Sequence, residues 1–294
     1  MKLLLIHTGG TIGMAPGPDG LRPAPGLVET ALAARLPKGT DLVNEVFAPL
    51  RDSADVSPAE WNRILTLMAD HPGRAVLLTH GTDTLAYTGA ALDQALAGSG
   101  RRLVICGAMV PLGMGGDAEA NLDLAVSALA EQGAGVFLAL GGALLPAGGL
   151  AKTDSHAPDA FTALPQPAPV PRAPHPAPFD ENKRLAILSL SPGMPAAMLE
   201  AALERLDAAV LRVFGAGTMM SDPAIMAALS RAAARGCRIR AVSQCLRGGL
   251  EPGAYAAGAA LWSAGVENGG LETAEAALAR LWLDLSDRAP RTIA

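Results

Sequence analysis

Two segments of the chain share one pattern, an apolar run that ends in a glycine turn carrying a threonine. The first covers residues 3–11 and reads LLLIHTGGT; the second covers residues 76–84 and reads VLLTHGTDT. Each apolar run is typical of a buried strand. In an open α/β sheet, ligands bind outside the carboxyl ends of the strands. The pair therefore predicts a site with two threonine hydroxyls, one of them beside Asp83.

Strand-like and helix-like segments alternate along the first half of the chain. Ser57, Pro58 and Glu60 stand at the N-cap, N1 and N3 positions of one expected helix. Prolines between residues 13 and 26 predict a long surface loop, of the kind that often forms a lid. The alternation predicts a mostly parallel sheet covered by helices. Strands are expected at residues 3–7, 75–79, 102–106 and 135–140, and helices at residues 27–35, 58–70, 85–96 and 121–132.

A proline-rich stretch interrupts this pattern between residues 165 and 178. Such a composition favours a semi-rigid linker. The alternation then restarts, with strands expected at residues 185–190, 209–214 and 238–242 and helices at residues 196–206, 223–235 and 273–283. We therefore expect a larger N-terminal α/β domain (residues 1–164), a linker (residues 165–184) and a smaller C-terminal α/β domain (residues 185–294).

Composition excludes several classes of protein. Half of the 294 residues are hydrophobic, and the net charge of −5 without a basic run argues against a nucleic-acid partner. Cys106, Cys237 and Cys245 form no C-x-x-C pair, so buried free thiols in a reducing cytosol are expected, with no disulfide framework and no metal site. Glycines and a proline break the uncharged stretch at residues 133–151, and no signal peptide is evident. We expect a soluble, cytoplasmic protein with no membrane partner.

Nucleotide binding is disfavoured by the first glycine turn. Its sequence, GGTIG at residues 9–13, lacks the G-x-G-x-x-G spacing, and a proline-rich loop follows it in place of a helix. A threonine nucleophile is an alternative, but its hydroxyl needs a nearby base. Lys152 could serve because burial lowers the pKa of lysine readily. From its local sequence alone, however, Lys152 is better interpreted as a solvated strand end.

Three motifs in this order resemble those of the bacterial L-asparaginase family: HTGGTIGM at residues 7–14, THGTDT at residues 79–84 and AKTD at residues 151–154. The segment SQCL at residues 243–246 resembles the cytoplasmic type I branch. The resemblance runs through nearly the whole chain. It implies the two-domain asparaginase fold and hydrolysis of a side-chain amide through an acyl-enzyme.

The resemblance also implies roles for individual residues. Thr11 matches the nucleophile, and Thr82 and Lys152 match the pair that activates a hydroxyl or water. Asp83 matches the carboxylate that holds the substrate α-ammonium. Ser53 matches a serine that binds the α-carboxylate. Gly10 and Gly81, which lie in the glycine turns, join the expected substrate-binding set because such turns can supply backbone N–H groups to an oxyanion.

Without the resemblance, Asp83 fits equally well as an acid at a helix N-terminus, and Ser53 as a turn serine. No metal or organic cofactor is implied. The implied partners are an amino-acid amide substrate and further copies of the chain, as a homodimer or a dimer of dimers.

The sequence departs from the family pattern at three positions. Leu21 stands where the lid usually carries a tyrosine that helps to activate the first threonine. Thr218 stands where asparagine is usual, and Ala54 where some members carry glutamine. These departures bear on substrate and turnover more than on the fold.

Alternatives to L-asparagine hydrolysis follow from these departures. Glutamine or another ω-amide is a near alternative, because one methylene in a pocket contributes only about 1–3 kcal/mol to discrimination. A second is an amino-acid-binding regulatory protein that has lost turnover, which Leu21 favours. An ammonia-supplying amidotransferase is disfavoured by the acidic composition and the lack of an extra N-terminal module. Cys245 could belong to a regulatory site, although a core thiol in a strand-end turn is the preferred interpretation.

Overall fold

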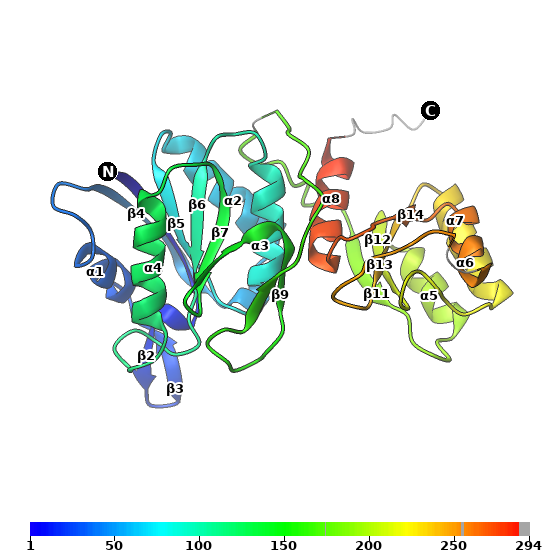
Figure 1. The fold of residues 1–294 in the computed structure, drawn as a ribbon, viewed down its shortest axis with the longest axis horizontal. Coiled ribbons are helices and arrows are strands. Elements are labelled where there is room, and N and C mark those ends of the chain that lie inside the picture. The colour runs from blue at the N-terminus through cyan, green and yellow to red at the C-terminus, as the bar shows by residue number, and fades with distance from the viewer. Residues whose placement is uncertain (174, 254–255, 288–294) are drawn as a thin grey trace. The chain divides into compact units, whose positions relative to one another are not determined.

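The structure is a computed structural model that describes residues 1–173, 175–253 and 256–287 (Figure 1). The chain divides into two compact units. The first comprises Met1–Ala163 and Pro169–Pro178, and the second comprises Leu164–Ala168 together with the chain from Phe179 onward. Both units are α/β, as predicted. The proline-rich stretch is shared between the units, and the limits of the linker expected from composition stay a prediction.

The first unit is built around a six-stranded sheet with the order β4-β1-β5-β6-β7-β8 (Figure 1). Neighbouring strands from β4 to β7 are parallel, and only β8 runs antiparallel to its neighbour. The apolar runs at the predicted strands are buried on both faces, which is typical of a parallel sheet covered by helices. The strands are β1 (Lys2–Gly9), β4 (Asp41–Arg51), β5 (Ala75–Thr79), β6 (Arg102–Cys106), β7 (Gly135–Leu140) and β8 (Ala143–Pro146).

Four helices cover this sheet: α1 (Leu27–Ala33), α2 (Pro58–Asp70), α3 (Leu85–Ala95) and α4 (Ala118–Ala130). Apolar residues of α1 and α4 share one core with β1, β5 and β6. The predicted start of α2 is confirmed. Ser57 accepts a hydrogen bond from the Ala59 amide, and the Glu60 carboxylate accepts one from the Ser57 amide at 2.9 Å. This reciprocal cap fixes where α2 begins.

The sequence prediction was wrong in two places within this unit. The proline-rich loop contains an antiparallel hairpin, β2 (Met14–Gly17) and β3 (Gly20–Pro23), in which the prolines lie in a two-stranded ribbon outside the main sheet. The edge strand β4 was not predicted, because its residues are mostly exposed or half-buried and lack a continuous apolar run. A short antiparallel pair, β9 (Leu150–Lys152) and β10 (Phe161–Ala163), follows β8.

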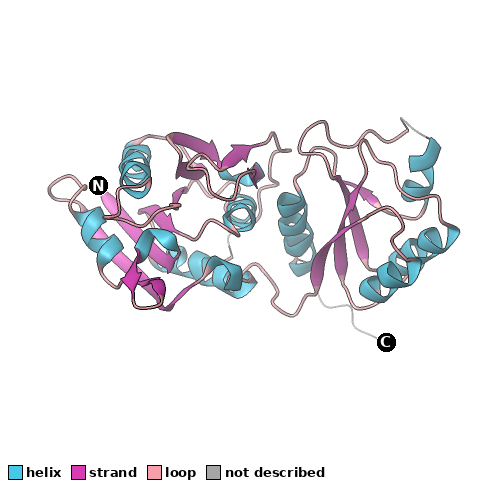
Figure 2. Cartoon of the chain, turned by 90° about the horizontal axis from the view of Figure 1, so that it is seen from below, coloured by secondary structure: helices cyan, strands magenta, loops and turns pink. Residues whose placement is uncertain are grey.

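The second unit has a four-stranded parallel sheet with the order β11-β12-β13-β14 (Figure 2). Its strands are β11 (Leu185–Ser189), β12 (Ala208–Val213), β13 (Arg238–Ser243) and β14 (Glu267–Asn268). Its helices are α5 (Ala196–Leu203), α6 (Pro223–Ala234), α7 (Ala256–Ser263) and α8 (Ala274–Ser286). Side chains of leucine, valine, isoleucine and alanine make up most of its core.

The three cysteines are free thiols, but they do not share one environment. Cys106 and Cys237 are buried, whereas Cys245 is exposed. The preferred interpretation of Cys245 as a core thiol is therefore wrong. Its position directly after β13 and Gln244 leaves it outside the packed sheet. In the described part of the chain, no helix is both long and apolar enough to cross a bilayer.

Candidate active site

The two glycine turns meet at the carboxyl edge of the first sheet. Strands β1 and β5 are parallel neighbours, with His7 paired to Thr79, so their ends lie side by side. Gly10 has φ of 91°, and a Cβ atom there would lie 2.5 Å from the amide nitrogen of Gly81. Only glycine allows this backbone contact. Thr11 and Thr82, the next residues along each turn, are therefore held in adjacent turns.

Ser53 lies beside the second turn. It begins the short 3-10 helix η2 (Ser53–Asp55), which follows β4 on the other side of β1. A Cβ atom on Gly81 would lie 2.7 Å from Ser53 Oγ, and Ser53 is only 4% exposed. The Thr84 hydroxyl donates to the Ser53 carbonyl at 2.6 Å, which ties η2 to the second turn. Gly10, Gly81 and Ser53 thus form one cluster.

Lys152, at the end of β9, reaches the second threonine turn. Its Nζ donates to Thr82 Oγ1 at 3.0 Å and to Asp83 Oδ1 at 2.7 Å. The lysine side chain is 19% exposed, while that of Asp83 is 71% exposed. Lys152 is therefore not the solvated strand end that its local sequence favoured. The arrangement places an ammonium group between a hydroxyl and a carboxylate that is open to water.

Thr11 is placed differently from Thr82. It opens the 3-10 helix η1 (Thr11–Gly13) and is half-buried. Within the part of the chain that the structure describes, its hydroxyl makes no hydrogen bond. The hairpin β2–β3 packs beside η1, and the Ala24 amide donates to the Gly13 carbonyl at 2.9 Å. The hydroxyl of Thr11 is thus free to meet a reactant.

A series of hydrogen-bonded, buried side chains holds the second turn in place. Sequence analysis gave these residues no role. His80 Nδ1 donates to the Gly81 carbonyl at 2.7 Å, and its Nε2 accepts from the Thr88 hydroxyl at 3.0 Å. Trp61 Nε1 in turn donates to Thr88 Oγ1 at 3.0 Å. Burial lowers the pKa of His80 and so favours the neutral ring, with the proton on Nδ1 and Nε2 as the acceptor. The position of His80 inside the THGTDT motif was the available clue.

The loop after β6 also borders the second turn. A Cβ atom on Gly107 would lie 3.3 Å from Thr82 Cγ2. Asn121 Nδ2 donates to the Gly107 carbonyl at 3.0 Å, and Asn121 Oδ1 accepts from the Gly141 amide at 3.0 Å. The Asp117 carboxylate accepts from the Met109 amide within this loop. Sequence analysis missed this pair, although a D-x-x-x-N spacing at a helix start could have indicated it.

The three departures from the family pattern lie in three different elements. Leu21 is 47% exposed in β3, where it pairs with Pro16. Thr218 belongs to the second unit and bridges to Phe214. Ala54 donates its amide to the Asp52 side chain. Among the described residues, no group of three or more His, Cys, Asp or Glu side chains is placed to hold a metal ion.

Comparison with known proteins places this geometry in a family. The N-terminal asparaginase domain matches residues 2–173, and the glutaminase/asparaginase C-terminal domain matches residues 184–292. L-asparaginase 1 of Escherichia coli K12 is 30% identical over 312 residues, which cover 97% of this chain and 92% of that protein.

Solved structures agree with the sequence comparison. The thermostable L-asparaginase from Thermococcus kodakarensis superposes with a TM-score of 0.84 at 26% identity, over 99% of this chain and 94% of that one. L-asparaginase I from Vibrio cholerae gives a TM-score of 0.82 at 28% identity, over 97% and 92% of the two chains. Both domain matches and these relatives span the whole architecture, and the chain is a member of the asparaginase family.

Proposed function

We propose that the protein hydrolyses L-asparagine to L-aspartate and ammonia through an acyl-enzyme on Thr11. The observation that carries the proposal is the contact of Lys152 with Thr82 and Asp83, in a turn that touches the Thr11 turn through Gly10 and Gly81. A nucleophile, a proton-handling pair and an anionic anchor are the parts that an amide hydrolase of this type needs. The names of the relatives support L-asparagine as the substrate.

Substrate binding is assigned to the charged and polar edge of the cluster. The exposed Asp83 carboxylate can hold the substrate α-ammonium, and the hydroxyl of Ser53 can donate to its α-carboxylate. An amino acid held by both groups on its α-carbon presents its side-chain amide in one orientation, which lowers the entropic barrier to attack. The α-ammonium would share Asp83 with Lys152, so binding would weaken the ion pair seen here.

The reaction divides into acylation and hydrolysis. The Thr11 hydroxyl oxygen attacks the amide carbon, its proton passes to a base and then to the departing nitrogen, and the C–N bond breaks to release ammonia. Water then adds to the resulting ester, and its cleavage restores the Thr11 hydroxyl and yields aspartate. Thr82 and Lys152 are assigned to the proton transfers, for which Lys152 must give up the proton it donates here.

The tetrahedral intermediate carries a negative oxygen that must be stabilised. Backbone N–H groups of the Gly10 and Gly81 turns are assigned to this role because the close contact of the turns fixes their directions. His80 supports the assignment indirectly, since it holds the Gly81 carbonyl through its Nδ1. Leu21 cannot accept or relay a proton, so this proposal leaves all proton transfer to Lys152, Thr82 and water.

Ammonia release by the purified protein tests the proposal. With L-asparagine, we expect release that Thr11→Ala abolishes; release from L-glutamine at the same or higher kcat/KM would instead assign the glutaminase alternative. Isothermal titration calorimetry distinguishes the regulatory alternative. Asparagine that binds without ammonia release would reject an enzyme and support a binding protein. Absence of both binding and release would reject the site assignment altogether.

The proposal includes assembly and location. We propose a homodimer or a dimer of dimers, on the resemblance to a family whose sites lie between paired subunits. Light scattering coupled to gel filtration tests this, and a monomer that hydrolyses asparagine at full rate would reject it. We also propose a cytoplasmic location, because Cys106, Cys237 and Cys245 are free thiols. Fractionation of the source cells, with recovery outside the cytoplasm as the contrary result, tests it.

A further inference from the structure

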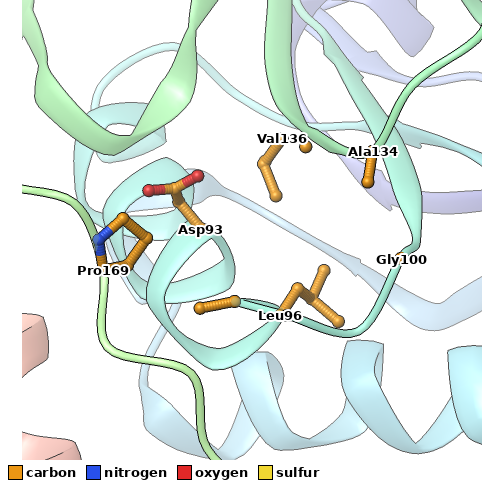
Figure 3. A pocket seen from close by; sticks show the side chains of 9 residues that line it. Asp93, Leu96, Gly100, Ala134, Val136 and Pro169 are labelled. Carbon is orange, nitrogen blue, oxygen red and sulfur yellow. The ribbon is translucent and has the colours of Figure 1, made fainter.

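A pocket lies at the amino-terminal ends of strands in the first sheet, whereas the candidate active site lies at the carboxyl ends. It has a volume of about 430 Å³ and is formed by the end of α3, the loop that leads to β6, and the start of β7 (Figure 3). The active-site turns follow the carboxyl ends of β1 and β5, whereas this pocket adjoins the amino-terminal ends of β6 and β7. The lining residues are Asp93, Leu96, Ala97, Gly98, Gly100, Ala134, Gly135, Val136 and Pro169.

Asp93 is the one ionisable residue in this lining. Its carboxylate lies between Pro169 and Val136 (Figure 3). Within the described residues it makes no hydrogen bond and no ion pair. Gly148 packs directly against one carboxylate oxygen, and a Cβ atom at that position would collide with it. The carboxylate is thus held at the pocket wall without a partner.

An unpartnered carboxylate in such a place is unfavourable for the protein alone. Burial raises the pKa of Asp93, and no neighbouring cation or hydrogen-bond donor opposes this effect. Asp93 is half-buried, and moving a charged group even partly out of water without a partner is unfavourable. Its oxygens are not sealed off, since they are absent from the fully buried polar atoms that lack a partner. A ligand entering the pocket can therefore reach them.

The lining selects the chemistry of that ligand. Leu96, Val136 and Pro169 offer apolar surface, and the pocket contains no cationic side chain that could attract an anion. A divalent metal ion takes several oxygen ligands, and one carboxylate supplies too few of them. An ammonium group, by contrast, needs one charge-assisted hydrogen bond and a few apolar contacts for its carbon body.

We propose that this pocket binds a small organic cation, a primary ammonium compound with a compact apolar body, through the carboxylate of Asp93. The volume lies within the range of small-molecule sites, about 300–1,000 Å³. The ligand would lie at the opposite ends of the strands from Thr11 and Thr82, so it would not be the substrate amide.

Benzylammonium is a suitable probe, with benzyl alcohol as the uncharged analogue. Saturation-transfer NMR and calorimetry on the full chain measure binding to the wild type, Asp93→Asn and Asp70→Asn. Asp70 is an exposed carboxylate at the end of α2 and controls for net charge. We expect Asp93→Asn to weaken benzylammonium binding by about ten- to hundredfold, with Asp70→Asn unchanged and benzyl alcohol weak in all three proteins.

A second variant keeps the proposal testable should Asp93→Asn fold poorly. Ala134 is exposed at the rim, so Ala134→Trp fills the pocket while leaving the carboxylate intact, and it should abolish binding without lowering thermal stability. Benzylammonium that binds equally to wild type and Asp93→Asn would overturn the proposal. So would no detectable binding to the wild type, or binding that survives Ala134→Trp.

Discussion

The two threonine turns end neighbouring strands of one sheet, yet they are equipped differently. The turn after β5 carries Thr82 with Lys152 Nζ at 3.0 Å from its hydroxyl, and Asp83 on the same lysine. The turn after β1 carries Thr11, whose hydroxyl makes no hydrogen bond within the described residues. Under the proposed function, the turn after β5 handles protons, and the turn after β1 presents the hydroxyl that attacks.

The largest expected effect is at the turn after β1. Thr11→Ala removes the proposed nucleophile and should lower kcat with L-asparagine by about a thousandfold or more. Thr11 is half-buried and its hydroxyl is unpaired, so thermal stability should change little. Thr30→Ala, on an exposed face of α1, is the matched control and should keep full activity. Activity retained in Thr11→Ala would contradict the assignment of the nucleophile to the turn after β1.

Lys152→Met tests the turn after β5. Methionine keeps the length of the side chain but cannot take or give a proton, so kcat should fall by about a hundred- to ten-thousandfold. Thr82→Val should act through the same pair, and the double variant should be little worse than either single one. Steady-state ammonia release measures all three. Additive losses would show that the two residues act independently.

Gly10→Ala tests whether contact between the turns matters. A Cβ atom at Gly10 would meet the Gly81 backbone at 2.5 Å, so the turns must separate. We expect kcat/KM to fall by about a hundredfold, since small misplacements of reacting groups are costly. Gly20→Ala is the control, because Gly20 also has a positive φ, of 118°, but no atom lies within 4 Å of its Cβ. Equal losses in both variants would indicate backbone strain alone.

The second turn should also make stability depend on pH. Burial lowers the pKa of His80 below its ordinary 6.5. The folded protein therefore binds this proton less readily than the unfolded chain. The contribution of the neutral histidine to the free energy of unfolding is complete above pH 6.5 and is lost as the pH falls below this value. The loss is up to about 1.4 kcal/mol per pH unit for each such histidine.

Chemical unfolding at several pH values measures this dependence. His80→Gln should flatten it below pH 6.5, leaving the share of His7, whose pKa is also lowered by burial. An unchanged slope in His80→Gln would contradict the lowered pKa of His80.

The smallest expected effect is at the hairpin. If the turn after β5 supplies the proton transfers, Leu21→Tyr should change kcat by less than about threefold, because the added hydroxyl duplicates an existing function. Leu21 is 47% exposed, so the larger side chain should be tolerated. A large gain in kcat would show instead that Thr11 needs a proton acceptor from its own side of the site.

The fold could be predicted from sequence where a strand consists of one continuous apolar run. Strands β5, β6 and β7 have the predicted limits because continuous apolar runs specify a strand buried on both faces. The edge strand β4 could not be predicted, since it lacks such a run. The hairpin β2–β3 was hidden by its prolines, which suit a two-stranded ribbon as well as a loop.

The candidate site was only partly predictable for a similar reason. Neighbouring parallel strands bring their carboxyl ends together, so the approach of the two threonine turns followed from the motifs alone. The motifs alone did not predict that Lys152 contacts Thr82, because this contact depends on the position of β9. Only the resemblance to the family indicated it. The chain from Trp61 to His80 and the pocket at Asp93 arise from tertiary packing between distant segments.

The most direct test of the division between the turns is to catch the acyl-enzyme. Wild-type protein mixed with L-asparagine, quenched in acid within milliseconds and digested, is analysed by mass spectrometry. The account predicts one aspartyl group on the peptide that contains Thr11, absent in Thr11→Ala and formed much more slowly in Lys152→Met. An aspartyl group on Thr82, or hydrolysis with no labelled threonine at any time, would contradict it.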